Sequence, residues 1–239
     1  MSLAKMKAKE PIEKGVCTLA HRRVLMVVTS HDQISPEHPT GIWLSEFSEP
    51  YTLFRNAGYE VTTASIAGGK APVDPRSLQE PVDADTAAAL KKLEATVPLR
   101  DVNTDEYDAI FLPGGHGTMY DLPGSQELAR TLRSFHDTGR VIAAVCHGPA
   151  GLLGATLADG SPLVKGKRVT GFTNEEEQAA GFAQLMPFLL EDRLRELGAT
   201  FVATPKWSDH VERDGRLITG QNPQSSVSTA QAVIDALDG

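Results

Sequence analysis

Short, continuous runs of apolar residues alternate along the chain with longer segments in which apolar residues recur at helical spacing. The short runs are typical of strands buried on both faces of a parallel sheet, and they predict strands at 24–30, 59–64, 108–112, 141–145, 168–172, 200–203 and 216–219. The periodic segments predict helices at 43–54, 85–95, 125–138, 186–198 and 227–237. Strands that alternate with helices in this way predict one α/β domain with a doubly wound, mostly parallel sheet and helices on both faces.

Three segments stand apart from this alternation. Residues 1–22 are charged and weakly periodic, so we expect a mobile N-terminal arm in front of a single domain at 23–239. Residues 66–78 contain a Gly-Gly pair and two prolines, which predict a long irregular loop of the kind that often serves function. Pro50 lies inside the first helical segment, where it predicts a kink or a late helix start.

The apolar run at 141–145 stops at Cys146. His147, Gly148 and Pro149 cannot continue a buried strand, and Pro149 fits the first turn of a helix. The pattern therefore predicts a thiol at a sharp strand-to-helix turn, as in a nucleophile elbow with Cys in place of Ser. The N–H groups of the following helix would favour the thiolate and lower the pKa of the thiol. The alternative is a buried structural cysteine beside a hydrogen-bonded histidine.

Two further segments contribute candidate groups. Glu46 lies among apolar residues of the first helical segment, so it is either a surface carboxylate or a buried acid with a raised pKa. The sequence Pro-Gly-Gly-His-Gly-Thr at 113–118 follows a predicted strand, so its backbone N–H groups should lie at the sheet edge where ligands bind. It lacks the residues of a P-loop and the G-x-G-x-x-G spacing, which leaves an oxyanion site as the interpretation.

An acidic cluster, Glu175, Glu176 and Glu177, follows the predicted strand at 168–172. It could hold a catalytic carboxylate. A capped helix N-terminus explains the same residues without any catalytic role, with Asn174 as the N-cap and the carboxylates beside the positive end of the helix dipole.

Composition and charge restrict the partners. The chain has 239 residues, 41% of them hydrophobic, and a formal net charge of -8, which disfavours nucleic acid and anionic membranes. No apolar run approaches the ~20 residues of a membrane span, and residues 1–14 lack the apolar core of a signal peptide, so we expect a cytoplasmic protein.

Cys17 and Cys146 are too few for a disulfide framework, and Cys17 should be a free thiol. The scattered histidines lack a two-His helix spacing, so no metal site is expected.

Five motifs together carry a family resemblance: Gly41-Ile42-Trp43-Leu44-Ser45-Glu46, Pro113-Gly114-Gly115-His116-Gly117-Thr118, Ala144-Val145-Cys146-His147-Gly148-Pro149, Thr170-Gly171-Phe172-Thr173 with Glu177, and Thr219-Gly220-Gln221-Asn222-Pro223. From about Arg23 to its end, the chain resembles the ThiJ/PfpI family of the class I glutamine amidotransferase-like superfamily. It is most similar to the branch of heat-shock chaperones and glutathione-independent glyoxalases, whose inserted segment corresponds to residues 64–105. The resemblance implies a flavodoxin-like three-layer α/β/α sandwich.

The resemblance also implies roles for individual residues. Cys146 would be the nucleophile, Glu46 the acid hydrogen-bonded to the thiolate, and Glu177 the group that orients His147. Gly115 and His147 would supply the backbone N–H groups of an oxyanion hole. The additional candidates are Gly114, His116 and Glu176, and Glu176 would replace Glu177 if the turn differed by one residue.

The implied activity is that of a glyoxalase III, which converts methylglyoxal to lactate without glutathione. Attack of a thiolate on the aldehyde gives a hemithioacetal whose oxyanion needs N–H donors. The next proton transfer, through an enediol, needs a base such as His147 or Glu46. No metal or other cofactor is required, and the only expected partner is a small dicarbonyl.

An amidase or peptidase is one alternative, and a stress chaperone or redox-sensing protein is another. A homodimer is an open option.

Overall fold

The computed structural model describes residues 22–78 and 81–239, and a seven-stranded sheet lies at the centre of this part of the chain. The strand order is β10-β11-β7-β6-β1-β4-β5, and all neighbours are parallel except β10 and β11. Its strands are β1 (Arg23–Val28), β4 (Glu60–Ser65), β5 (Val97–Pro98), β6 (Ala109–Leu112), β7 (Val141–Val145), β10 (Val211–Asp214) and β11 (Leu217–Gly220). Two small sheets pair β2 (Gln33–Ser35) with β3 (His38–Pro39) and β8 (Arg168–Val169) with β9 (Thr200–Phe201).

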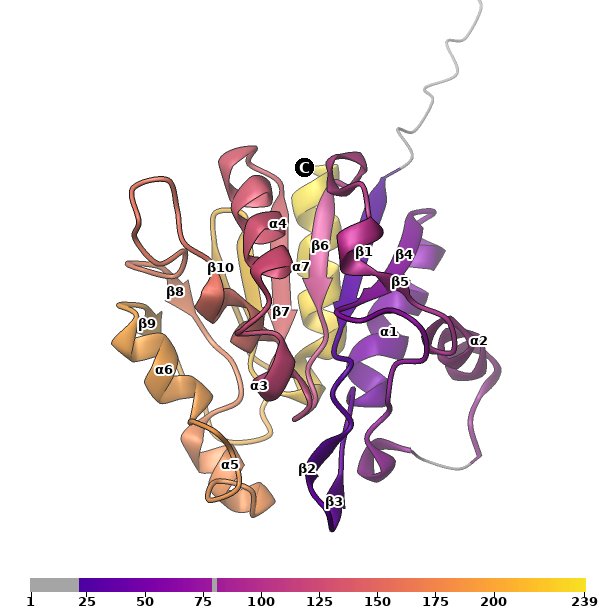
Figure 1. Ribbon diagram of the computed structural model, residues 1–239. Coiled ribbons are helices and arrows are strands. Elements are labelled where there is room, and N and C mark those ends of the chain that lie inside the picture. Colours follow the sequence, from indigo (N-terminus) through magenta and orange to yellow (C-terminus); the bar gives the residue numbers. More distant parts are fainter. Residues whose placement is uncertain (1–21, 79–80) are drawn as a thin grey trace, which may run out of the picture.

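Helices cover both faces of the central sheet. They are α1 (Leu44–Asn56), α2 (Ala84–Leu93), α3 (Thr118–Asp121), α4 (Gln126–Asp137), α5 (Asn174–Ala180), α6 (Leu190–Glu196) and α7 (Ser226–Asp238). Figure 1 shows α4 in front of the sheet and α1 and α7 behind it. Because both faces are covered, the side chains of β6 and β7 are buried throughout, which explains their continuous apolar sequences. The predicted three-layer α/β/α sandwich is confirmed.

The chain N-terminal to the sheet is described from Arg22 onward. The Arg22 guanidinium donates to the Leu237 carbonyl (2.6 Å) and to Asp108 (3.3 Å). The rest of the predicted arm at 1–22, including Cys17, lies outside the described residues, so the prediction of a mobile arm stays a prediction. Within the described ranges, no helix is both long and apolar enough to cross a membrane.

Three predicted elements are clearly shorter than expected: the strands at 168–172 and 200–203, of which the second ends at Phe201, and the helix at 186–198. The strand at 168–172 ends at Val169, because the N–H groups of Thr170 and Phe172 donate to Thr219 Oγ1 and to the Cys146 carbonyl instead of to a neighbouring strand. The helix predicted at 186–198 begins only at Leu190, after Leu189 in an extended conformation, and Pro187 disfavours a helical conformation for Met186. The segment after β8 instead runs beside Cys146, at the end of β7.

Smaller differences concern turns and caps. Pro50 is accommodated inside α1, so the predicted late helix start is wrong. The N-cap of α5 is Thr173, not Asn174, and Thr173 and Glu176 form a capping box. After Cys146 the chain forms a 3₁₀ helix, Gly148–Gly154, where an α-helix was expected. The loop at 31–40 contains the β2–β3 hairpin, which no sequence pattern indicated.

Candidate active site

Cys146 occupies a strained turn directly after β7. Its φ is 60°, a left-handed value that is rare for a residue with a side chain. The turn is held on both sides, because the Cys146 N–H donates to the Gly220 carbonyl (3.0 Å) and the Cys146 carbonyl accepts from the Phe172 N–H (2.8 Å). A Cβ on Gly148 would lie 2.1 Å from the Leu112 carbonyl oxygen, so the chain can double back only with glycine there. The geometry is that of a nucleophile elbow.

On one side of the thiol lies His147, which is itself bound to Glu177. Nδ1 of His147 lies 3.3 Å from Cys146 Sγ, and its Nε2 lies 2.6 Å from Glu177 Oε2. Burial alone would raise the pKa of Glu177, but His147 and a second imidazole donor outweigh burial and hold this pKa well below its usual range. An ionised Glu177 accepts a proton from Nε2, which leaves Nδ1 of His147 free to accept the thiol proton.

The second donor to Glu177 is His116, whose Nε2 lies 2.8 Å from Oε1. On its other side, Nδ1 of His116 lies 3.1 Å from Nη2 of Arg76. Because a guanidinium group can only donate, Nδ1 of His116 must be the acceptor and its ring proton must be on Nε2. Burial and the neighbouring His147 lower the pKa of His116 to about 4, so this imidazole is neutral at neutral pH.

On the other side of the thiol lies Glu46, which is fully buried. The surface alternative for this residue is therefore wrong. Oε2 accepts the N–H of Gly114 (2.8 Å), whereas Oε1 has no hydrogen-bond partner within the described residues. The Cys146 thiol is close enough to this carboxyl to act on its pKa. Burial raises the pKa of Glu46 to about 8, although Cys146 and the Gly114 N–H act in the opposite direction. The carboxyl is thus mostly protonated at pH 7.

The thiol itself differs from our expectation. Burial raises the pKa of Cys146 above its ordinary value, and the charge of Glu46 and the hydrogen bond to it act in the same direction. The N–H of His147 lowers this pKa, but its effect is the smaller one. The expected preformed thiolate is therefore replaced by a thiol that needs a base, and Nδ1 of His147 is placed to be that base.

Two backbone N–H groups belong to residues beside the thiol, Gly115 and His147. Neither donates to an oxygen or nitrogen of the described residues, and the His147 N–H acts on the Cys146 sulfur. The Thr118 hydroxyl lies 2.8 Å from the Gly115 carbonyl and 3.1 Å from the His147 carbonyl, which holds the two segments together. A Cβ on Gly114 would lie 2.6 Å from the His147 nitrogen, so a larger residue would separate them. This arrangement can bind an oxyanion.

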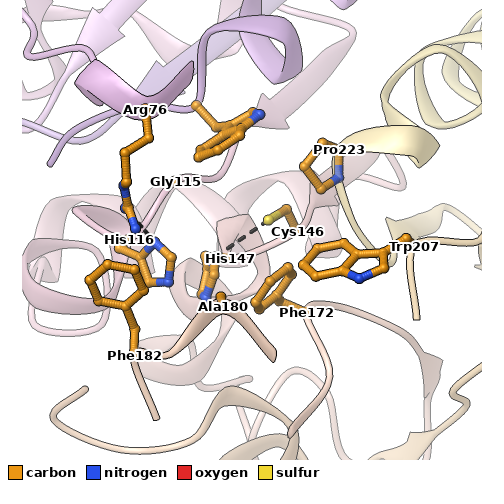
Figure 2. Close-up of a pocket in the computed structure, with 11 residues that line it drawn as sticks. Arg76, Gly115, His116, Cys146, His147, Phe172, Ala180, Phe182, Trp207 and Pro223 are labelled. Carbon is orange, nitrogen blue, oxygen red and sulfur yellow. Dashed lines mark hydrogen bonds between the residues drawn. The ribbon is translucent and has the colours of Figure 1, made fainter. Parts of the chain in front are cut away.

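Above these groups is a cavity of about 240 Å³. It is lined by Trp43, Arg76, Gly115, His116, Cys146, His147, Phe172, Ala180, Phe182, Trp207 and Pro223. Figure 2 shows aromatic rings on several sides of the thiol, with the Arg76 guanidinium beside His116 and Phe182. Arg76, Phe182 and Trp207 were not identified from the sequence. The one available signal was the irregular segment at 66–78, which carries Arg76.

Comparison with known proteins identifies the family. The sequence profile of the DJ-1/PfpI family matches residues 40–236. The chain belongs to the DJ-1/PfpI family. Its relatives include the glutathione-independent glyoxalase HSP31 of Saccharomyces cerevisiae, which is 35% identical over 92% of this chain and 99% of the relative. Glyoxalase 3 of Candida albicans is 33% identical over 90% of this chain and 98% of the relative.

Solved structures agree with this membership of the DJ-1/PfpI family. The crystal structure of glyoxalase III from Candida albicans matches with a TM-score of 0.81 and 32% identity, over 90% of this chain and 97% of that chain. The X-ray structure of the rapid encystment protein REP24 from Francisella tularensis matches with a TM-score of 0.87 and 37% identity, over 90% and 99%. The predicted resemblance to the ThiJ/PfpI family is confirmed.

In this DJ-1/PfpI member, Glu176 is not a partner of His147. Its Oε1 accepts from Gln221 (3.0 Å), Asn222 (2.8 Å) and the Trp207 N–H (2.8 Å), and its Oε2 accepts from the N–H and hydroxyl of Thr173. Trp207 has a left-handed φ of 64° and forms one wall of the cavity. The Gly-Gln-Asn-Pro motif at 220–223 therefore holds Glu176 in place through Gln221 and Asn222. Glu176 in turn fixes the backbone of Trp207 at the cavity wall.

His116, His147 and Glu177 also have the spacing of a metal site, with ligand atoms within 4.8 Å of one another. Their protonation does not fit one. Both Nε2 atoms carry protons directed at Glu177, and His116 cannot move its proton to Nδ1 while Arg76 donates there. A metal ligand needs an imidazole nitrogen without a proton. The expected absence of a metal stays a prediction, which elemental analysis of the purified protein would test.

Proposed function

We propose that this protein is a glutathione-independent glyoxalase that converts methylglyoxal and water to lactate through a covalent intermediate on Cys146. The observation that carries the proposal is the position of Cys146 between two carboxyls. The pKa of Glu46 is raised, and the pKa of Glu177, which contacts the thiol through His147, is lowered. Environments that separate the pKa values of two acids indicate an acid and a base role. The relatives named as glyoxalases support the choice of substrate.

In the first step, Sγ of Cys146 bonds to the aldehyde carbon while the thiol proton passes to Nδ1 of His147. The electron pair of the carbonyl moves to its oxygen, where the N–H groups of Gly115 and His147 stabilise the negative charge. Ionised Glu177 stabilises the imidazolium that forms. Return of the proton to the oxygen gives a neutral hemithioacetal.

The second step moves a proton between two carbons. His147, neutral again, removes the proton from the former aldehyde carbon, and protonated Glu46 donates to the neighbouring ketone oxygen, which gives an enediol. Protonation of the ketone carbon and loss of the other hydroxyl proton give a thioester with a hydroxyl group beside it. One carbon is oxidised and its neighbour is reduced, so no external electron acceptor is needed.

The third step is hydrolysis of the thioester. Water adds to the thioester carbonyl, the same backbone N–H groups stabilise the oxyanion, and the C–S bond breaks as the thiol regains a proton. The products are lactate and the starting enzyme.

The test is incubation of the purified protein with methylglyoxal in the absence of glutathione, followed by a lactate assay. We expect lactate from the wild type and none above background from Cys146→Ala. A Glu175→Gln variant is a suitable control, because Glu175 is an exposed acid on the same turn of α5 as Glu177. Unchanged turnover in Cys146→Ala would overturn the proposal.

The same preparation separates the alternatives. Release of amine from small amides, without lactate formation, would indicate an amidase or peptidase. Suppression of aggregation that persists in Cys146→Ala, without dicarbonyl turnover, would indicate a chaperone. A redox-sensing role is disfavoured, because oxidation-sensitive cysteines are exposed and have a lowered pKa, whereas Cys146 is buried and its pKa is raised.

A further inference from the structure

We propose that Arg76 is a positioning residue for the catalytic histidine: it fixes the tautomer of His116 and so keeps a second N–H donor on Glu177. The proposal rests on the proposed function for its activity readout. Its structural readouts need no substrate. Neither Arg76 nor its partner Asp74 belongs to a motif that the sequence indicated.

The first step is how rigidly Arg76 is held. Asp74 caps the 3₁₀ helix Pro75–Ser77, and its Oδ1 accepts from the backbone N and from Nε of Arg76, both at 2.9 Å. Its Oδ2 accepts from Nη2 of Arg76 and from the Thr40 hydroxyl (2.9 Å). Asp74 is fully buried. A paired, forked contact of this kind fixes the plane of the guanidinium.

The second step is where this plane points. The Arg76 guanidinium lies 4.1 Å from the centre of the Phe182 ring, and Nη2 reaches Nδ1 of His116 at 3.1 Å. Figure 2 shows Arg76 extended along this side of the cavity toward His116. The charged and titratable groups that face His116 are Arg76, Glu177 and His147. Of these, only Arg76 contacts Nδ1, while Glu177 accepts at Nε2, so Arg76 and Glu177 select the same tautomer and Arg76 is the group that keeps the proton off Nδ1.

The third step is the consequence for Glu177. With its proton on Nε2, His116 donates to Oε1 while His147 donates to Oε2, so each carboxylate oxygen has its own donor. In the other tautomer, the Nε2 lone pair of His116 would face Oε1 at the same distance, and the repulsion would move Glu177 away from His147. Correct orientation of an imidazole by a carboxylate has a large effect on rate. Arg76 therefore acts on Cys146 through three intervening side chains.

The decisive measurement is ¹⁵N NMR of the histidine side chains in the full-length protein at neutral pH. In the wild type we expect His116 to be unprotonated at Nδ1 and protonated at Nε2. In Arg76→Met we expect a measurable population protonated on Nδ1 beside the Nε2 tautomer, and an upward shift of the pKa of His116, because a neighbouring positive charge is lost. A His116 that stays wholly protonated on Nε2 in Arg76→Met, or a wild-type His116 that carries its proton on Nδ1, would overturn the proposal.

The activity test is a double-mutant cycle. Arg76→Met should lower kcat by roughly tenfold with little change in KM, as for loss of an outer partner of a functional histidine. Arg76→Lys keeps a cation beside Asp74 and should recover part of the loss. In His116→Gln the side-chain amide can donate to Glu177 without any tautomer to fix, so Arg76→Met should cost less than about twofold in that background. Additive losses would mean a merely structural role for Arg76.

Arg195→Met is a matched control, because Arg195 also pairs with an acid (Glu191) and lies over a ring (Phe201) but is remote from the cavity. It should leave all readouts unchanged. If the protein does not act on methylglyoxal, the same cycle is run on the rate of Cys146 alkylation, which depends on His147 as the base. A failed proposed function is then distinct from a failed role for Arg76.

Discussion

The two carboxyls that flank Cys146, Glu46 and Glu177, are both buried, yet their pKa values move in opposite directions. Glu46 accepts one backbone N–H, and burial raises its pKa to about 8. Glu177 accepts two imidazole N–H groups, one on each oxygen, which hold its pKa below the usual range. Burial acts on both in the same direction, so the number and charge of the hydrogen-bond donors decide the outcome. One carboxyl can then supply a proton while the other stabilises a cation.

The largest predicted effect comes from removing the charge of Glu177. In Glu177→Gln one of the two imidazole N–H groups would face the amide NH₂ in place of an oxygen, and the negative charge that orients His147 and stabilises its imidazolium form would be lost. Turnover should fall by up to ~10⁴-fold, as when a catalytic histidine is held in the wrong tautomer. The measurement is kcat for lactate formation. Glu175→Gln should retain full activity, and an equal loss in both variants would contradict this role.

Replacing Glu46 should lower turnover by a comparable or smaller factor, and it should make the Cys146 thiol more reactive. Glu46→Gln loses the exchangeable proton, so kcat should fall by ~10²–10⁴. The same change removes a charge that raises the pKa of Cys146, so alkylation of the thiol between pH 7 and 9 should become faster. Parallel assays of alkylation and lactate formation test this divergence. If both rates fall together, Glu46 is not the acid. Exposed Glu175 provides the control, as Glu175→Gln.

Glu176 is predicted to matter for stability more than for chemistry. Glu176→Ala would leave five donors without their acceptor, two of them on the side chains of Gln221 and Asn222. The free energy of unfolding should fall by about 2–4 kcal/mol, as when a buried hydrogen-bond network is broken. Urea unfolding followed by tryptophan fluorescence measures this loss. Turnover per folded molecule should fall far less than in Glu177→Gln, and the reverse order would contradict the comparison.

Most of the contrast between Glu46 and Glu177 could not be predicted from the sequence. The elbow could be predicted, because an apolar run that ends in Cys-His-Gly-Pro has few other structural solutions. The alternatives for Glu46, and the choice between Glu176 and Glu177 as the partner of His147, could not be resolved by pattern, because both depend on contacts between residues thirty or more positions apart. The structure decides them through the hydrogen bond from Gly114 to Glu46 and the contact of His147 with Glu177.

The predicted direction of the pKa shift of Cys146 was wrong for a physical reason. The sequence argument assumed a full α-helix after Cys146, whose aligned N–H groups would stabilise a thiolate. The helix that forms, Gly148–Gly154, is a 3₁₀ helix, and desolvation at the fully buried sulfur outweighs the single N–H of His147. Arg76 was missed because its position depends on the irregular segment before α2, for which periodicity gives no information.

The smallest predicted effect is a pH dependence of stability that arises from the raised pKa of Glu46. Its pKa rises from an ordinary value near 4.5 to about 8 on folding, so between these values the folded chain binds more protons than the unfolded chain, and stability falls as pH rises. His116 acts in the opposite direction between pH 4 and 6.5, because its pKa falls to about 4. Glu177 gains its stabilisation above its unfolded pKa and loses it only in strong acid. The two shifts of Glu46 and His116 largely offset each other up to pH 6.5.

From pH 6.5 to 8 only the Glu46 effect remains among these three groups, and the free energy of unfolding should fall by about 1–2 kcal/mol, given at most 1.36 kcal/mol per pH unit for one proton. Urea unfolding at a series of pH values measures the slope. Glu46→Gln cannot titrate and should flatten it, whereas Glu175→Gln should leave it in place. A wild-type stability that is constant or rises over this interval would mean that Glu46 is already ionised at neutral pH, and Glu46 could not then donate the proton that the enediol step requires.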